Sequence, residues 1–229
     1  MWCLKKLTAG FIACMELILQ LYAKPYNPQY PVVCFDERPC QLLASVTPDE
    51  PMQPGRCQRQ DSEYKRCGTC CVLASIEPLT GKRIVHVQAR RRNKEFALFM
   101  QELAAAYPEA NRVKVVMDNL STHSYAALYQ HLPAEQAFRL MNKLEFIYTP
   151  KKASWLNMIE IEFSALSRMC LNRRIATIEE LKNAVVAFMD ERTRKAIKIS
   201  WQFTITKARD KMSSAYEKVF TGNKKYIKT

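Results

Sequence analysis

An apolar segment that ends abruptly in polar residues constrains the fold of this chain more than any other feature. Val113–Met117 is rich in β-branched residues and is followed by Asp118 and Asn119, a pattern typical of a buried strand that stops at an acidic tip. In open α/β sheets, ligands bind outside the carboxyl ends of strands, so Asp118 is well placed to hold a metal ion or a substrate. Alternatively, Asp118 and Asn119 only begin a turn, as these residue types often do.

Two further carboxylates stand in comparable positions. Pro31–Phe35 is a short apolar segment that ends in Asp36, which predicts a second strand with an acidic tip. Glu160 lies where apolar residues recur at helical spacing, so we expect it in the first turn of an amphipathic helix. Because Asn157 stands three residues before Glu160, a capping box is an alternative, in which Glu160 would only accept a hydrogen bond from a backbone amide. Glu162 lies about 200° round this helix from Glu160, so only one of the two can face a shared site.

Three short segments resemble the catalytic core of IS630-family transposases, which belong to the Tc1/mariner group of DDE recombinases. They are Val-Val-Cys-Phe-Asp-Glu at 32–37, Met-Asp-Asn-Leu-Ser-Thr-His at 117–123 and Tyr-Thr-Pro-Lys-Lys-Ala-Ser-Trp-Leu-Asn-Met-Ile-Glu-Ile-Glu at 148–162. The segments occur in the family's order, and the resemblance runs from about residue 2 to about residue 220. It implies that Asp36, Asp118 and Glu160 are the catalytic residues. They would hold two Mg²⁺ ions, or Mn²⁺ as a substitute, with Asp36 bridging the two ions.

The resemblance also implies an activity and a set of partners. Such enzymes cleave DNA at the ends of an insertion sequence, then use the freed 3′-hydroxyl to attack target DNA without a covalent protein intermediate. The implied partners are element-end and target DNA, on which the chain would assemble as a homo-oligomer. The implied location is the prokaryotic cytoplasm, on the nucleoid, with no role for a membrane.

Residues beside the predicted triad have implied supporting roles. Asn119 and His123 match family positions next to the second aspartate, where they would orient the substrate or support the metal ligands; alternatively, they only stabilise the loop. Lys151 and Lys152 precede the helix that carries Glu160, and we expect them to contact phosphates. Two other functions remain open: a non-catalytic DNA-binding remnant of a transposase, and a ribonuclease H-like nuclease that acts outside transposition.

The charge of the chain supports a polyanionic partner. It has 35 Lys and Arg against 22 Asp and Glu, a net charge of +13, which favours nucleic acid. The run Arg90-Arg91-Arg92 follows an expected strand. It either grips phosphates or forms an ordinary solvated surface.

The nine cysteines raise the alternative of a zinc site. Cys67 and Cys70 have C-x-x-C spacing, with Cys71 beside them and Cys57 upstream, which is half of a zinc-ribbon pattern. The second half is missing, so we interpret these residues as strand and loop positions with reduced thiols.

The remaining pattern predicts an α/β fold of the ribonuclease H-like type, a mixed five-stranded sheet with helices on both faces. The expected strands are 31–35, 69–76, 82–89, 113–117 and 144–148, with the first three antiparallel and a long polar loop at 43–64. The expected helices are 4–22, 93–107, 124–131, 133–143, 154–170, 177–191 and 204–216.

The predicted organisation has three parts. Residues 1–30 form a linker helix and proline-rich lead-in, 31–192 the catalytic domain, and 193–229 a C-terminal helical extension with a basic tail. The apolar stretch from Leu7 to Tyr22 resembles a signal peptide, but Glu16 interrupts it and it is too short to span a bilayer. By resemblance, this helix joins the core to an N-terminal helix-turn-helix region, so we expect a truncated chain.

Overall fold

The computed structural model describes residues 7–221 and 223, except 49, 58 and 60. Its centre is a five-stranded mixed sheet with the order β3-β2-β1-β4-β5. The strands are β1 (Val32–Ser45), β2 (Tyr64–Ile76), β3 (Arg83–Gln88), β4 (Val113–Met117) and β5 (Leu144–Tyr148). β1, β2 and β3 pair antiparallel, while β4 is parallel to both β1 and β5. The mixed sheet and the antiparallel arrangement of the first three strands are confirmed.

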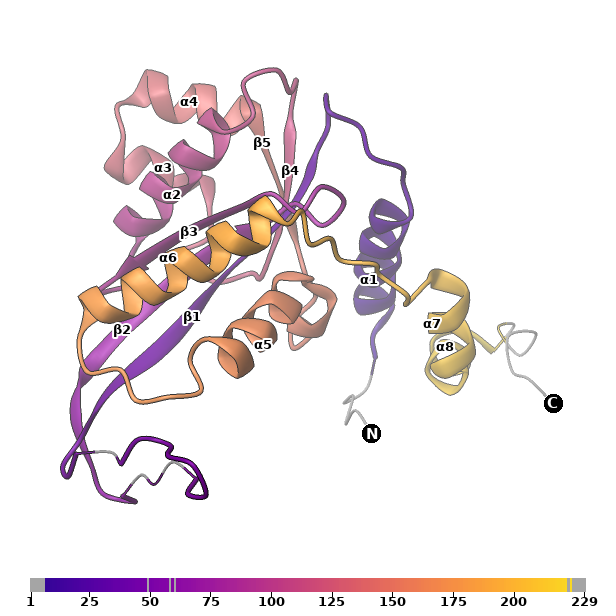
Figure 1. Ribbon diagram of the computed structural model, residues 1–229. Helices are drawn as coiled ribbons and strands as arrows, with labels where there is room; N and C mark the ends of the chain where they lie inside the picture. The colour runs from indigo at the N-terminus through magenta and orange to yellow at the C-terminus, as the bar shows by residue number, and fades with distance from the viewer. Residues whose placement is uncertain (1–6, 49, 58, 60, 222, 224–229) are drawn as a thin grey trace.

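Helices cover both faces of the sheet, as predicted (Figure 1). One face packs against α2 (Asn93–Ala105), α3 (Tyr125–His131) and α4 (Ala134–Lys143). The other packs against α5 (Ile159–Met169) and α6 (Ile178–Arg194). Side chains alternate along a strand, and in β1 Phe35 faces the first set of helices whereas Cys34 faces the second. The same alternation determines which face of the sheet each later residue of β1 points to.

The first and the last described helices meet in a third apolar cluster. It joins α1 (Ala9–Tyr22) to the 3₁₀ helix η1 (Ser154–Leu156), α7 (Ile205–Lys211) and α8 (Ser213–Val219). The single helix expected at 204–216 is therefore two, because the backbone leaves helical geometry at Met212 (φ −114°, ψ 20°).

A polar contact explains the acidic residue in the apolar stretch of α1. Glu16 accepts two hydrogen bonds from Arg209 of α7, at 2.8 and 2.9 Å, and one from the Tyr216 hydroxyl of α8, at 2.7 Å. The carboxylate thus fixes α1 to the C-terminal helices. Within the part of the chain that is described, no helix is long and apolar enough to cross a membrane.

The prediction that the first strand ends at Phe35 is wrong. β1 continues through Asp36 and Pro39 to Ser45 and forms a long hairpin with β2, which extends well beyond the rest of the sheet in Figure 1. β1 pairs with β4 only from Val32 to Cys34. Beyond Cys34, β2 is the one described strand that pairs with β1, so a proline can be accommodated where one side of the strand carries no ladder.

Candidate active site

The three predicted carboxylates approach one edge of the sheet from three elements. Asp36 lies two residues beyond the last position at which β1 pairs with β4, and Asp118 directly follows Met117, the last residue of β4. Because the two strands are parallel there, both residues lie at the same edge. Asp36 shares the face of Cys34 by alternation, and α5 on that face carries Glu160 in its first turn.

The charges of the neighbouring carboxylates act on both Asp36 and Glu160. Burial, with a smaller contribution from the charges of Asp118 and Glu160, raises the pKa of Asp36 to about 7, against a hydrogen bond from the Glu37 amide and the charge of His123. Partial burial also raises the pKa of Glu160, as does the charge of Asp118, while Arg38 opposes this shift. The site is therefore a group of mutually repelling carboxylates that favours a bound cation.

The chemistry of this donor set fits a hard divalent metal ion. All three side chains offer carboxylate oxygens, the ligands that Mg²⁺ and Mn²⁺ prefer. Among the residues with described positions, no group of three or more His, Cys, Asp and Glu side chains converges closely enough to enclose a metal ion.

His123 holds the Asp118 carboxylate from the opposite face of the sheet. Its Nδ1 lies 2.6 Å from Asp118 Oδ1, and its Nε2 lies 3.5 Å from Glu37 Oε1. The ring is fully buried and stacks on Phe96 with centroids 5.0 Å apart. Burial lowers the pKa of His123, but hydrogen bonds and the charges of Asp118 and Glu37 outweigh it and raise the pKa to about 9. A protonated His123 at neutral pH orients the Asp118 carboxylate.

Sequence reasoning placed His123 beside the site but missed Glu37. Glu37 is buried and points to the face opposite Asp36, since the two are consecutive in β1. A second acidic residue within an apolar strand was the available signal, because a buried carboxylate requires a partner. Asn119, by contrast, is exposed in the loop after β4.

The capping box considered as the alternative role of Glu160 does not form at the start of α5. The residue that caps α5 is Met158. The side-chain oxygen of Asn157 accepts from the Ile159 amide at 3.4 Å, and its side-chain amide donates to the Phe35 carbonyl at 2.8 Å. Asn157 therefore ties the start of α5 to β1 beside Asp36, a positioning role that sequence reasoning did not assign.

Glu162 has the opposite environment from Glu160 and is a structural residue. It is fully buried, and Arg83 and Arg192 each donate two hydrogen bonds to its carboxylate, at 2.8–2.9 Å. Burial raises its pKa, but the hydrogen bonds and charges of the two arginines lower the pKa overall. Only Glu160 is on the side of the predicted triad, so the helical geometry separates the two glutamates as expected.

The predicted phosphate contacts lie on two sides of the site. Lys151 and Lys152 are exposed in the loop between β5 and α5, and Lys152 has a left-handed backbone (φ 65°). Arg90, Arg91 and Arg92 are exposed after β3. Arg92 is engaged with Glu95 at 2.6 Å.

A basic hollow of about 390 Å³ adjoins the loop that carries Asp118. Thr122 of that loop lines it together with Arg91, Arg92, Asn93, Lys94 and His131. Arg91, Arg92 and Lys94 thus bring positive charge to a hollow that adjoins the loop after β4, and such charges hold the phosphates of nucleic acid.

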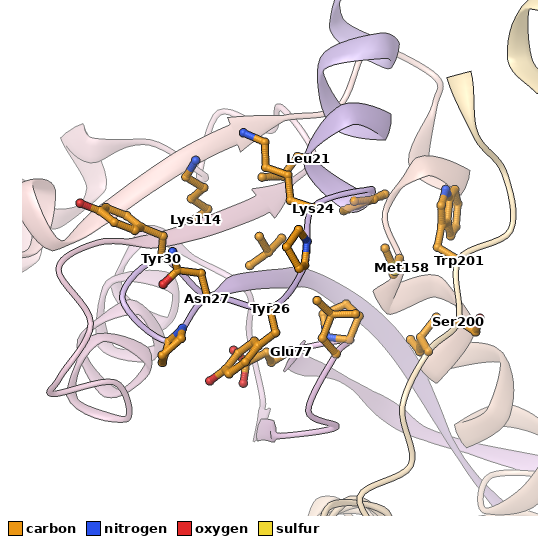
Figure 2. Close-up of a pocket in the computed structure, with 17 residues that line it drawn as sticks. Leu21, Lys24, Tyr26, Asn27, Tyr30, Glu77, Lys114, Met158, Ser200 and Trp201 are labelled. Carbon is orange, nitrogen blue, oxygen red and sulfur yellow. The ribbon is translucent and has the colours of Figure 1, made fainter. Parts of the chain in front are cut away.

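A larger hollow lies elsewhere. It measures about 610 Å³ and lies at the other edge of the sheet, next to Val32 and Lys114 where β1 and β4 begin. Figure 2 shows it between Tyr30 and Lys114 on one side and Met158 and Trp201 on the other. None of the three carboxylates lines it. Trp201 packs on Tyr22 with ring centroids 5.4 Å apart.

The four cysteines of the possible zinc pattern, Cys57, Cys67, Cys70 and Cys71, are strand and loop residues, as predicted. Cys70 and Cys71 are adjacent in β2 and therefore face opposite sides of the sheet, each within a different core cluster. Cys57 and Cys67 are exposed. Cys3 lies outside the described residues.

Comparisons with known proteins identify a family and a fold for this chain. The family described as DDE superfamily endonuclease matches residues 31–182. The fold is similar to that of the Mos1 mariner paired-end complex with Mn (TM-score 0.55, 15% identity, 100% of this chain and 67% of that chain). It is also similar to the Mos1 strand transfer complex (TM-score 0.57, 14% identity, 100% and 66%). This likeness confirms the ribonuclease H-like fold, and the chain spans about two thirds of the length of those chains. The comparison with curated proteins gave no match.

Proposed function

Because the chain belongs to the DDE superfamily endonucleases, we propose that it is the catalytic part of an IS630-type transposase that cleaves and joins DNA. The observation that carries this proposal is the approach of Asp36, Asp118 and Glu160 to one sheet edge, where the charges of Asp118 and Glu160 raise the pKa of Asp36 and the charge of Asp118 raises that of Glu160. A buried carboxylate among like charges is costly unless a cation joins it, so the arrangement supports a metal-dependent reaction.

The roles of the residues follow from their contacts. Asp36, Asp118 and Glu160 would hold the metal, and two Mg²⁺ ions, or Mn²⁺, would activate the attacking oxygen and stabilise the leaving oxygen. His123 fixes the orientation of Asp118, with Glu37 behind it. Asn157 fixes the start of α5, and with it Glu160, against β1.

Basic side chains on both sides of the triad support DNA as the substrate. We assign phosphate contacts to Lys151 and Lys152 on one side and to Arg90, Arg91 and Arg92 on the other. The similar solved structures include a paired-end complex and a strand transfer complex of Mos1. By analogy, the proposed DNA partners are element ends and a target duplex, with the chain assembled as a homo-oligomer on the prokaryotic nucleoid.

The proposed organisation keeps 31–192 as the catalytic domain, with 1–30 and 193–229 as flanking segments. The packing of α1 against α7 and α8 supports a joint role for these segments as one support beside the catalytic domain. Within it, the Glu16–Arg209 ion pair connects the first helix to the C-terminal extension.

A cleavage assay tests the proposed function. The natural chain should nick supercoiled DNA in Mg²⁺ or Mn²⁺ but not with a chelator, and should join 3′-hydroxyl ends of its element to a second DNA. Asp118→Asn should lose both activities, whereas Asp61→Asn, in the exposed hairpin loop, should keep them. Cleavage without joining would favour a nuclease outside transposition. No metal-dependent cleavage by the natural chain would favour a non-catalytic DNA-binding remnant.

A further inference from the structure

Two cysteines face each other across the long β1–β2 hairpin. Cys40 of β1 is the direct antiparallel partner of Cys70 of β2. Cys70 is buried in the core under α5 and α6, and Cys40, which is half-buried, packs against the same cluster. Cys71 faces the opposite side of the sheet. Of the two adjacent cysteines in β2, therefore, Cys70 alone shares a face with Cys40.

The geometry of a direct cross-strand pair suits a disulfide. Directly opposed residues have Cα atoms about 4.5 or 5.5 Å apart, and both values lie within the roughly 4.4–6.8 Å that disulfides span. Their Cβ atoms, about 4.5–5.5 Å apart, must approach to about 3.8 Å. The required movement is thus on the order of 1 Å.

The hairpin can accommodate this movement because it is a two-stranded ribbon at this point. The pairing of β1 with β4 ends at Cys34, and that of β2 with β3 extends only to Cys71. Among the described strands, no third one holds Cys40 or Cys70 from the side. Twist is also larger in two-stranded ribbons than in wider sheets.

We propose that Cys40 and Cys70 form a reversible cross-strand disulfide under oxidation, a modification site that fixes β1 to β2 on the α5–α6 side of the sheet. With a peroxide as oxidant, the Cys40 thiolate attacks a peroxide oxygen, the O–O bond breaks, and a sulfenic acid and water result. Cys70 then attacks the Cys40 sulfur, and the sulfenic oxygen leaves as water. Two thiols lose two electrons and two protons, and hydrogen peroxide becomes two waters.

The surroundings of the two thiols set the order and the rate of this reaction. Cys40 is the more accessible and is the first to react, and its thiol donates to the Arg38 carbonyl at 3.8 Å. Burial raises the pKa of Cys40, although the charge of Arg38 opposes it. Burial raises the pKa of Cys70 to about 11. Both thiols are therefore weak nucleophiles at neutral pH, and the bond should form over minutes to hours.

The bond would restrain the strand that carries Asp36. Asp36 lies four residues before Cys40 on the same face of β1, beyond the last β4-paired residue. The loop closed by the bond runs from residue 40 to residue 70, which is long enough for a large loss of unfolded-chain entropy. Oxidation should therefore raise the melting temperature by about 5 °C or more.

Oxidation of the full chain with hydrogen peroxide, followed by thermal melting and tandem mass spectrometry of a non-reducing digest, tests this proposal. The natural chain should lose the mass of two hydrogen atoms, show a Cys40–Cys70 cross-link and gain the melting-temperature shift, all reversed by dithiothreitol. Cys40→Ser, at a half-exposed position, should fold and show neither change. Cys170→Ser is the matched control, since Cys170 packs against the same core, and it should keep both.

Three results would overturn the proposal. One is a cross-link that joins other cysteines, such as the exposed Cys57 and Cys67, without Cys40 and Cys70. Another is oxidation of Cys40 to sulfinic acid in place of a bond. The third is a bond and melting shift that persist in Cys40→Ser.

Discussion

Two glutamates on the first turn of α5 show how position on a helix decides the role of a residue. Glu160 is exposed beside Asp36 and Asp118 and has a raised pKa. Glu162 is buried between Arg83 and Arg192 and has a lowered pKa. The same residue type therefore contributes to a charged site on one side of the helix and to a buried ion-pair network on the other.

Substitution to glutamine should separate these two roles. Glu160→Gln removes a proposed metal ligand from an exposed position, so it should abolish metal-dependent cleavage and leave the free energy of unfolding within about 0.5 kcal/mol. Glu162→Gln leaves two arginines without their counter-charge and should cost about 3 kcal/mol or more of stability. The measurements are urea unfolding and cleavage rate per folded molecule.

The pH dependence of stability provides a further check on Glu162. Because folding lowers its pKa, its contribution is present above the unfolded carboxyl pKa of about 4.3 and is lost as pH falls through the lower folded pKa. Glu162→Gln should lack this acid-dependent loss. If Glu162→Gln instead abolished cleavage while remaining stable, and Glu160→Gln kept cleavage, the assignment on α5 would be reversed.

At the scale of elements, local pattern determined some boundaries and missed others for physical reasons. The bounds of β4 and β5 were predicted correctly, since both are short apolar strands. β4 lies between β1 and β5 and is parallel to both. β1 was predicted too short because its second half is polar and contains Pro39. Such a segment resembles a loop in the sequence, and its pairing with the one described neighbouring strand, β2, is seen only in the structure. The same limit hid Glu37, whose partner His123 lies far along the chain.

The β2–β3 turn depends on a glycine in a left-handed conformation. Gly81 has φ +84°, and a Cβ there would lie 2.9 Å from backbone atoms of Ala196 and Ile197. Gly81→Ala should therefore lower the free energy of unfolding by about 2 kcal/mol or more, from strain and the clash together. Gly55→Ala is the matched control, because φ is +79° but nothing lies within 4 Å, and it should cost about 1 kcal/mol. Equal losses in urea unfolding would show that the contact with Ala196 and Ile197 is unimportant.

At the scale of the whole molecule, charge and topology act together. The sheet brings the carboxylates of β1, β4 and α5 to one edge, while a net charge of +13 gives the surface the sign that attracts DNA. The sheet arrangement and the net charge were both accessible from the sequence. The net charge is a sum over residues, and the order of elements restricts the sheet topology. Sequence reasoning did not predict that α1 packs on α7 and α8 through Glu16 and Arg209, because nothing in the local pattern pairs residues so distant in the chain.

Salt dependence should reveal which cations contact DNA. Each neutralised phosphate contributes about −0.9 to the slope of log K against log salt. Lys151→Gln combined with Lys152→Gln should reduce the magnitude of this slope by about 2 in fluorescence titrations with duplex DNA. Lys182→Gln combined with Lys218→Gln changes the net charge equally at exposed positions on α6 and α8. A slope that changes as much in this control pair would show that the loop lysines make no specific phosphate contacts.

The central claim is that Asp36, Asp118 and Glu160 form one metal site, and a calorimetric titration with Mn²⁺ tests it most directly. The natural chain should bind Mn²⁺ and melt at a higher temperature in its presence by mass action, because the ion relieves repulsion among the carboxylates. Asp36→Asn, nearly isosteric, should bind at least about tenfold more weakly, a loss of roughly 1.4 kcal/mol, while Asp61→Asn should bind as the natural chain does. Equal Mn²⁺ affinity in the natural chain and Asp36→Asn would contradict the claim.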